Sequence, residues 1–341
     1  MSDIAAKAGT SVAAVSVTLN GAKSKTLRIS QETRSRILLA AEELGYRRNP
    51  MAGALATGRT HVLGLMLPYT DAYAEHDPFY SLITTGVTAC ASRRGYNVML
   101  YTATAEEEGP RAAAMIDKRI DGLILVSPPA QTPIYEECRR QRIAVVSIMG
   151  PRAENLLAVD SDDYQGGLIA TRHLLGLGHR RIAHLAGKPD VPTTEPRRQG
   201  YVDALSEAGI ASDEELCRPG DFNRATGYTS ASRLMRLPAD RRPTAIFAAN
   251  DLSAHGAIDA IHDAGLKTPE DVAVVGYDDT WYATVVRPAL TSVRMDVAAI
   301  GGRAAELIID LLDGVEGPQR TSTVLPVSLT VRDSCGAVSR T

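Results

Sequence analysis

The sequence contains no long apolar run. The apolar stretches at residues 143–150 and 272–276 are far shorter than the roughly 18 residues that a membrane-spanning helix needs, so we expect no membrane span. The first residues also have no basic start followed by an apolar stretch, which marks a secretory signal. We therefore expect the protein to be cytoplasmic.

Cysteines are few, and they lie far apart without any CxxC spacing. Such a pattern predicts buried thiols in a reducing compartment, and it excludes a disulfide framework or a cysteine-based metal site. The four residues are Cys90, Cys138, Cys217 and Cys335.

Common catalytic motifs are missing as well. No GxSxG, GxxxxGK[ST], HExxH or GxGxxG motif occurs in a supporting context. His173, His179 and His184 have the residue type of a metal site, but His173 is expected on a helix and His184 in a strand. We therefore expect no enzymatic activity, no cofactor and no metal.

Charge is distributed unevenly along the 341 residues. Residues 1–60 carry nine Lys or Arg against four acidic residues, a net charge of +5, and the remaining residues carry −8. A basic segment on an acidic body favours a nucleic acid partner, because Lys and Arg neutralise backbone phosphates. Uneven charge also arises by chance, so this signal is weak alone.

Three short helices are predicted in residues 1–48. We expect Ser2 to cap the first, Gly9 to end it in a left-handed turn, and Ser11 to cap the second. The third begins after a cap at Ser30 and stops at Gly45. Two helices joined by a turn of about three residues form a helix-turn-helix, or a helical hairpin that only packs on the next domain. The apolar positions at helical spacing are Ile4, Ala5 and Ala8, then Val12, Val15 and Leu19, then Ile37, Leu38, Ala41 and Leu44.

Residues 49–60, NPMAGALATGRT, form a candidate linker. Pro50 can begin a helix, but the turn that follows is too short to be stable alone in water. Gly53 weakens it by a further ~1 kcal/mol relative to Ala.

Residues 61–341 alternate between short apolar strands and helices, a pattern typical of parallel sheets with helices on both faces. The strands suffice for two such sheets, with chain crossings expected near residues 151–160 and 278–294. Ligands bind such folds where the carboxyl ends of the strands point. Helices are predicted at residues 79–94, 110–119, 133–141, 163–177, 197–208, 225–235 and 252–264.

Several motifs resemble the lactose and galactose repressor (LacI/GalR) family of bacterial transcriptional regulators. DIAAKAGTSVAAVSVTLNG and ISQETRSRILLAAEELGYRRNPMAGALATGRT resemble the head of that family, and GLGHRRIAHLAG, GDFNRATGY, FAANDLSAHGAIDAI and DVAVVGYDDT resemble its body. The resemblance implies an all-α helix-turn-helix headpiece at 1–48, a hinge helix at 49–60, and a periplasmic-binding-protein-like α/β body at 61–341. That body would consist of two doubly wound parallel-sheet subdomains that bind an effector and dimerise. A homodimer on double-stranded, pseudo-palindromic operator DNA, acting as a repressor, is the implied assembly.

The resemblance also assigns DNA contacts to the head. Val17 stands where the family usually has Arg, and Ala14 where it often has Thr, so the second helix would read DNA largely by apolar contacts. Leu55 falls at the position of the family's minor-groove wedge. The remaining expected DNA-contacting residues are Ser11, Val12, Ala13, Ser16, Val17, Asn20, Ser30 and Thr33.

In the body, the resemblance implies effector contacts at the carboxyl ends of strands. A neutral sugar or small glycoside is the first expectation, because planar polar side chains bind adjacent hydroxyls and an aromatic ring covers the apolar face. A purine-like ring stacked on Phe79 and Phe222 is the alternative, whereas Asp251 is expected to be a helix cap. A secreted solute-binding protein shares this architecture but would need a signal peptide and no helix-turn-helix. The expected effector contacts are Phe79, Tyr80, Arg197, Phe222, Asn250 and Asp278, with Tyr73 and Trp281 as additional cleft surface.

Overall fold

The computed structural model describes residues 1–20, 28–47, 53–54, 57–69, 77–104, 113–128, 132–151, 156–315 and 322–337. The chain divides into two compact units, Met1–Val62 with Arg119–Asp121, and Leu63–Lys118 with Gly122–Thr341. Among the described residues, no helix has the length and apolar character required to cross a membrane. The predicted wedge Leu55 and the predicted cleft residue Tyr73 lie outside the described residues.

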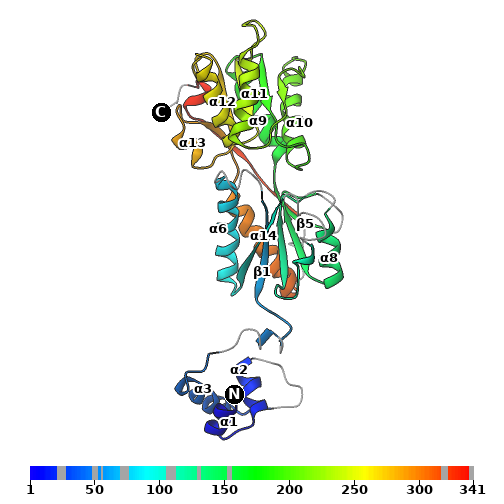
Figure 1. Ribbon diagram of the computed structural model, residues 1–341, viewed down its shortest axis with the longest axis vertical. Helices are drawn as coiled ribbons and strands as arrows, with labels where there is room; N and C mark the ends of the chain where they lie inside the picture. The colour runs from blue at the N-terminus through cyan, green and yellow to red at the C-terminus, as the bar shows by residue number, and fades with distance from the viewer. Residues whose placement is uncertain are drawn as a thin grey trace. The chain divides into compact units, whose positions relative to one another are not determined.

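The helices α1 (Ser2–Ala8), α2 (Val12–Asn20) and α3 (Gln31–Glu43) lie in the described part of the first unit (Figure 1). Gly9 ends α1 with φ 61°, a left-handed conformation that glycine adopts without strain. The Ser11 hydroxyl accepts a hydrogen bond from Ala14 N at 3.2 Å. The Ser30 hydroxyl accepts one from Thr33 N at 3.2 Å, so the predicted caps of the second and third helices are confirmed.

Two expectations for this unit are wrong. Ser2 is itself the first residue of α1, whose N-cap is Met1 and carries no side-chain cap. Leu38 and Leu44 are 51% and 45% exposed, because they lie off the α3 face that Ile37 and Ala41 present to the core. The buried core consists of Ile4, Ala5, Ala8, Ala14, Val15, Ile37, Ala40 and Ala41.

The second unit is built on two six-stranded sheets, which confirms the prediction of two sheets. The first sheet has the order β11-β5-β4-β3-β1-β2, and helices α6 (Pro78–Arg93) and α14 (Val297–Asp313) pack side by side against it (Figure 1). Helix α8 (Pro133–Gln141) lies where the sequence predicts it and contacts β4. The strands are β1 (Val62–Tyr69), β2 (Asn97–Thr104), β3 (Gly122–Val126), β4 (Ala144–Ile148), β5 (Leu157–Ser161) and β11 (Thr323–Leu325).

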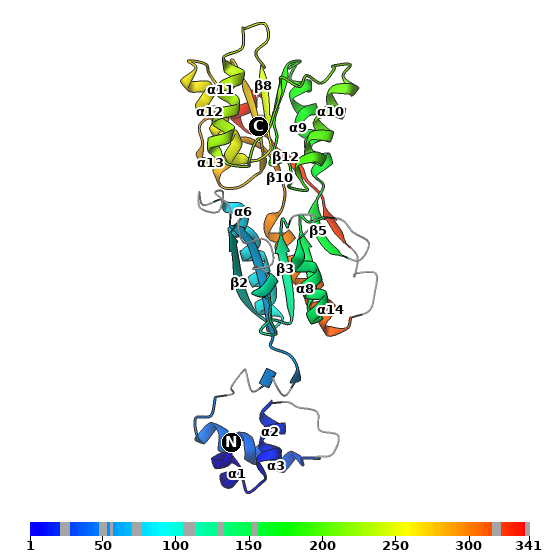
Figure 2. The same ribbon diagram turned by 45° about the vertical axis from the view of Figure 1, so that its right-hand side comes forward.

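The second sheet has the order β12-β10-β9-β8-β6-β7, and it is parallel except for β12, which pairs antiparallel with β10. Figure 2 shows β8 between the helix pair α9 and α10 and the pair α11 and α12, so helices cover both faces of this sheet. The strands are β6 (Ile182–Leu185), β7 (Cys217–Arg218), β8 (Ala245–Ala248), β9 (Ala273–Asp278), β10 (Thr291–Arg294) and β12 (Ser328–Thr330). The helices are α9 (Asp163–Gly176), α10 (Thr194–Glu207), α11 (Arg224–Met235), α12 (Asp251–Asp263) and α13 (Tyr282–Val285), followed by the short 3-10 helix η1 (Asp333–Cys335).

The chain passes between the two sheets three times. It leaves the first sheet after β5, returns after β10 into α14, and leaves again between β11 and β12. The sequence places the first two passages slightly early and misses the third, because strands of three residues are too short to show periodicity. Of the helix predicted at 110–119, the described residues 113–114 are helical and residues 115–119 are not, so the predicted end at 119 is wrong.

Candidate functional site

The guanidinium of Arg197 is the centre of a buried polar cluster at the carboxyl ends of the second sheet. Arg197 lies in α10, the helix that follows β6, and its side chain is 3% exposed. Nε donates to Asp163 Oδ1 at 2.8 Å and Nη1 donates to the carbonyl of Ala249 at 2.5 Å. The guanidinium also lies 3.6 Å from the ring centroid of Tyr277 and 5.9 Å from that of Phe222. Arg197 is therefore held in one orientation by four neighbours.

The carboxylate of Asp163 supplies the countercharge. Asp163 is the first residue of α9, and it also accepts hydrogen bonds from Ser161 at 3.1 Å and from the hydroxyl of Tyr277 at 3.2 Å. Burial alone would lower the pKa of Arg197, but the nearby charges of Asp163, Tyr277 and Asp278 raise it above its usual value. The cation at Arg197 is thus permanent.

Asp278 is a second buried ionisable group of this region, and it directly follows Tyr277. It is the last residue of β9, 6% exposed, with φ 101°. Burial raises the pKa of Asp278 well above its usual value, Arg197 opposes this shift, and the charges of Asp251, Asp77 and Asp163 add to it. Within the described residues the Asp278 carboxylate makes no hydrogen bond. Among the described residues, no donor occupies its acceptor oxygens.

Asn250 and Phe222 are coupled to each other. Asn250 is the N-cap of α12, because its Oδ1 accepts from Ser253 N at 2.9 Å, and its Nδ2 donates to the carbonyl of Phe222 at 2.7 Å. Phe222 has φ 56°, and its ring lies against Gly187, where a Cβ would stand 2.0 Å from Cζ. The amide of Asn250 is therefore largely occupied in holding the Phe222 loop.

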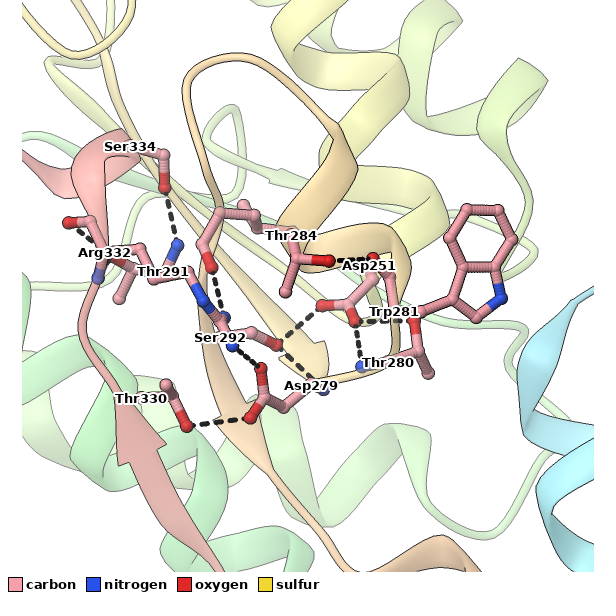
Figure 3. A network of polar contacts seen from close by, with 11 residues as sticks. Asp251, Asp279, Thr280, Trp281, Thr284, Thr291, Ser292, Thr330, Arg332 and Ser334 are labelled. Carbon is pink, nitrogen blue, oxygen red and sulfur yellow. Dashed lines mark hydrogen bonds and ion pairs between the residues drawn. The ribbon is translucent and has the colours of Figure 1, made fainter.

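The predicted cap at Asp251 is wrong, since the residue before it caps the helix. The Asp251 carboxylate points instead to the segment after β9, where Oδ2 accepts from Thr280 N at 2.7 Å and from the Thr280 hydroxyl at 3.0 Å. Its Oδ1 accepts from the Ser292 hydroxyl at 2.6 Å (Figure 3). Asp251 thus supports the loop that begins at Asp278.

The predicted aromatic contacts are less uniform. Phe79 and Tyr80, in the first turn of α6, are buried and meet edge to face with ring centroids 5.1 Å apart. The charge of Asp77, the N-cap of α6, adds to the rise in the pKa of Asp278, so this helix start lies within electrostatic range of the end of β9. Trp281 is 56% exposed and stacks on Tyr282 at 4.2 Å, and its described contacts do not join it to Arg197.

A hollow of about 840 Å³ lies elsewhere, among α11, α12 and α13. Its polar lining is largely paired with itself. Arg224 donates to Asp259 at 2.8 Å, and the Tyr228 hydroxyl donates to Asp263 at 2.8 Å. The Arg197 cluster, which has an acceptor to spare, is the better candidate for ligand recognition.

In the first unit, Ser11, Val12 and Ala13 are exposed at the start of α2, while Ser16 and Val17 are half-buried. The hydroxyls of Ser30 and Thr33 lie 2.9 Å apart at the start of α3. Asn20 is the last residue of α2, and the structure describes its backbone only. The start of α2 therefore exposes small and apolar side chains.

The three histidines considered as metal ligands occupy separate sites. His173 Nε2 lies 3.2 Å from the sulfur of Cys335, and His179 Nδ1 lies 3.0 Å from the Thr244 hydroxyl. His184 is fully buried between the rings of Tyr201 and Phe247. Across the ranges that the structure describes, no three His, Cys, Asp or Glu side chains are grouped to hold a metal.

Comparison with known proteins identifies the family. Residues 1–49 match bacterial regulatory proteins of the lacI family, and residues 171–335 match a periplasmic binding protein-like domain. The transcriptional regulator CelR of Thermobifida fusca is 35% identical over 337 residues, which cover 97% of this chain and 96% of CelR. The chain belongs to the lacI family of bacterial regulatory proteins. As a member of this family it is a DNA-binding transcription regulator, with a helix-turn-helix head and an α/β body.

Other lacI-family relatives agree in sequence and fold. The transcriptional repressor PurR of Erwinia tasmaniensis is 31% identical over 329 residues, covering 95% of this chain and 93% of PurR. A structure of a CelR–cellobiose complex matches with a TM-score of 0.74 and 32% identity over 97% of this chain and 98% of that one. The Lac repressor dimer bound to operator and the anti-inducer ONPF matches with a TM-score of 0.81 and 27% identity over 98% of both chains.

Sequence reasoning missed Asp163, Tyr277 and the support that Asp251 gives through Ser292. Asp163 carries one signal, since it begins a helix directly after a strand, where ligand contacts of parallel sheets gather. Tyr277 reads as an ordinary buried strand residue, and its contact with Arg197 depends on the sheet order. No local sequence pattern predicts that Tyr277 contacts Arg197.

We expect the free energy of unfolding to fall as the pH rises from about 5 to about 7. Burial raises the pKa of Asp251 to about 7, whereas an unfolded Asp titrates near 4. Between these values the native state binds more protons than the unfolded state, so each pH unit removes up to about 1.4 kcal/mol. The shift of Asp278 acts in the same direction. Urea unfolding at both pH values measures the effect. Asp251→Asn should reduce this slope and the exposed Asp240→Asn should not. An unchanged slope in Asp251→Asn would contradict the assignment.

Proposed function

We propose that this regulator is a repressor of carbohydrate-related genes whose DNA affinity is altered by a neutral sugar or small glycoside bound beside Arg197 and Asp278. The observation that carries the proposal is the Asp278 carboxyl group. It is buried, it directly follows Tyr277, on whose ring the Arg197 guanidinium lies, and it makes no hydrogen bond in the described part of the chain. A carboxylate and a guanidinium together bind adjacent hydroxyls through charge-assisted hydrogen bonds.

The aromatic residues complete this chemistry. Phe222 lies near Arg197. Phe79 and Tyr80 are in the first turn of α6, and the charge of Asp77, the N-cap of this helix, contributes to the raised pKa of Asp278. Rings at such positions cover the apolar face of a pyranose. The relative CelR has been solved in complex with cellobiose, which favours a sugar for this chain too.

The proposed DNA partner is a double-stranded, pseudo-palindromic operator, and the proposed assembly is a homodimer. The relative Lac repressor is a dimer on its operator, and a helix-turn-helix reads two half-sites about one helical turn apart only when it is paired. In this proposal Ser11, which caps α2, and the α2 residues Val12, Ala13, Ser16 and Val17 meet the major groove. Leu55 enters the minor groove. In this proposal the protein acts in the cytoplasm by binding operator DNA and the effector, and it uses neither catalysis nor a cofactor.

The variant Asp278→Ala tests the proposal. We expect it to weaken effector binding by roughly tenfold to a hundredfold, because one charge-assisted hydrogen bond contributes on the order of 1.5 to 3 kcal/mol. Calorimetry with cellobiose, glucose and a purine base measures the affinity. Retardation of a duplex selected from a random library by the wild-type protein measures DNA binding. The variant should bind this duplex as wild type does, and the sugar should no longer change that binding.

The same panel decides between the two effector classes. Binding of the purine base with no response to either sugar would favour the alternative, a planar ring stacked on Phe79 and Phe222. The 31% identity with PurR keeps this alternative in the test. Wild-type affinity for a sugar in Asp278→Ala would remove Asp278 from the site.

A further inference from the structure

We propose that Arg332 is a positioning residue for effector recognition, acting through Asp279 on the backbone corner that presents Asp278. This inference rests on the proposed function, in which Asp278 contacts the effector. Arg332 lies in the C-terminal segment, between β12 and η1, and does not itself belong to the Arg197 cluster.

The corner consists of two consecutive residues in an unfavourable conformation. Asp278 has φ 101° and Asp279 has φ 54°. Residues other than glycine adopt such angles at a cost, and they keep them only where surrounding contacts impose them. The direction of the Asp278 carboxylate therefore depends on whatever holds the corner.

Arg332 holds one side of it. Its Nη2 forms an ion pair with Asp279 Oδ1 at 2.7 Å, and both side chains are largely buried. The hydroxyl of Thr330, the last residue of β12, donates to Asp279 Oδ2 at 2.8 Å (Figure 3). The end of β12 and the residues that follow it therefore bind both carboxylate oxygens. A partly buried ion pair is screened less than an exposed one and fixes geometry better.

Arg332 is itself fixed to the sheet. Nη1 donates to the carbonyl of Leu290 at 2.7 Å, and the backbone N–H of Arg332 donates to the Thr291 hydroxyl at 2.8 Å. Two residues on, the Ser334 hydroxyl donates to the carbonyl of Val274 at 2.6 Å and accepts from Thr291 N at 2.9 Å. The C-terminal segment is thus a rigid base from which Arg332 reaches the corner.

The other side of the corner is held by Asp251. The Ser292 hydroxyl accepts from Asp279 N at 3.1 Å and donates to Asp251, which also accepts both bonds from Thr280. Figure 3 shows Asp279 between the Arg332 side and the Asp251 side of this network. Asp279 and Thr280 are bound by the protein, whereas the Asp278 carboxylate has no hydrogen bond among the described residues. A binding site needs such an arrangement, in which one carboxylate can contact the ligand while the protein holds the neighbouring residues in place.

A double-mutant cycle tests the assignment, because a residue that acts through Asp278 must lose its effect when Asp278 is changed. The variants are Arg332→Met, Asp278→Asn and their combination, with cellobiose, glucose and a purine base as probes in calorimetry. We expect Arg332→Met to weaken binding about tenfold, equal to about 1.4 kcal/mol. In the Asp278→Asn background the same change should alter Kd by less than about twofold. Arg332→Lys keeps a cation for Asp279 and should recover most of the affinity.

Two further variants keep the test decisive. Arg172→Met removes a more exposed ion pair with the same N–O distance between α9 and α10, Arg172 to Glu207 at 2.7 Å, and should leave Kd unchanged. Thr330→Val removes the second bond to Asp279 and serves if Arg332→Met does not fold. It should weaken binding in the same direction, and again only when Asp278 is present.

The outcomes separate this inference from the function on which it rests. Equal losses with and without Asp278, or an unchanged Kd in Arg332→Met and Thr330→Val, would overturn the positioning role alone. A wild-type protein that binds none of the three probes, or an Asp278→Asn variant with wild-type affinity, would overturn the proposed effector site and the positioning role with it.

Discussion

Replacing Arg197 by alanine is expected to lower the free energy of unfolding by about 3 to 5 kcal/mol, because it leaves a buried carboxylate without its cation. Asp163 is 7% exposed and accepts the Nε hydrogen bond of Arg197 at 2.8 Å. The carbonyl of Ala249 and the ring of Tyr277 also lose their partner. The effector should no longer bind measurably, since the guanidinium and the ordered cluster are both lost.

Urea unfolding measures the stability, and calorimetry with cellobiose measures binding. Arg172→Ala is the matched control, since it breaks an exposed ion pair of the same lobe, and such pairs contribute about 0 to 1 kcal/mol. The double variant Asp163→Asn/Arg197→Ala removes the unpaired charge and should regain part of the stability without regaining effector binding. A loss in Arg197→Ala no larger than in Arg172→Ala would contradict the buried pair.

Deleting residues 1–60 is expected to abolish operator binding while effector binding survives. The deleted segment carries a net charge of +5 and the rest of the chain carries −8. The attraction to phosphates therefore resides in the head, and full-length affinity should fall steeply with salt. The remaining body keeps both sheets and the Arg197 cluster.

Gel retardation at two salt concentrations and calorimetry with cellobiose measure the two activities. If the body from residue 61 onward retards the selected duplex, the assignment of DNA binding to the head is wrong. If it loses effector binding as well, the body requires the head in order to fold.

Local features of this protein were predictable because they depend on neighbours in the sequence. Ser11 and Ser30 cap their helices through backbone groups three residues away, and Gly9 takes the left-handed turn that its missing Cβ permits. Helix α8 has the predicted bounds because Pro133 begins it and Ile143 resumes a strand pattern at once. The alternation of strands and helices likewise predicted two parallel sheets.

Local sequence does not decide which of two adjacent residues caps helix α12. Asn250 and Asp251 are both good N-caps, and the preference for Asp251 was wrong. Asp251 is drawn away by Thr280 and Ser292, which lie 29 and 41 residues further along the chain. Hydrogen-bond partners so far apart in the chain leave no periodic pattern in the sequence.

The sequence by itself determined the short helices of the head and the parallel α/β architecture, and through its motifs it indicated the helix-turn-helix, the family and the residues of the proposed site. Only the tertiary structure decided how that site is built. The order β12-β10-β9-β8-β6-β7 brings Asp163, Arg197 and Tyr277 together, and it brings Arg332 to Asp279. The physical reason is that periodicity and capping depend on interactions between residues close in the sequence. The pairing of buried charged groups depends instead on contacts between strands that are far apart in the chain.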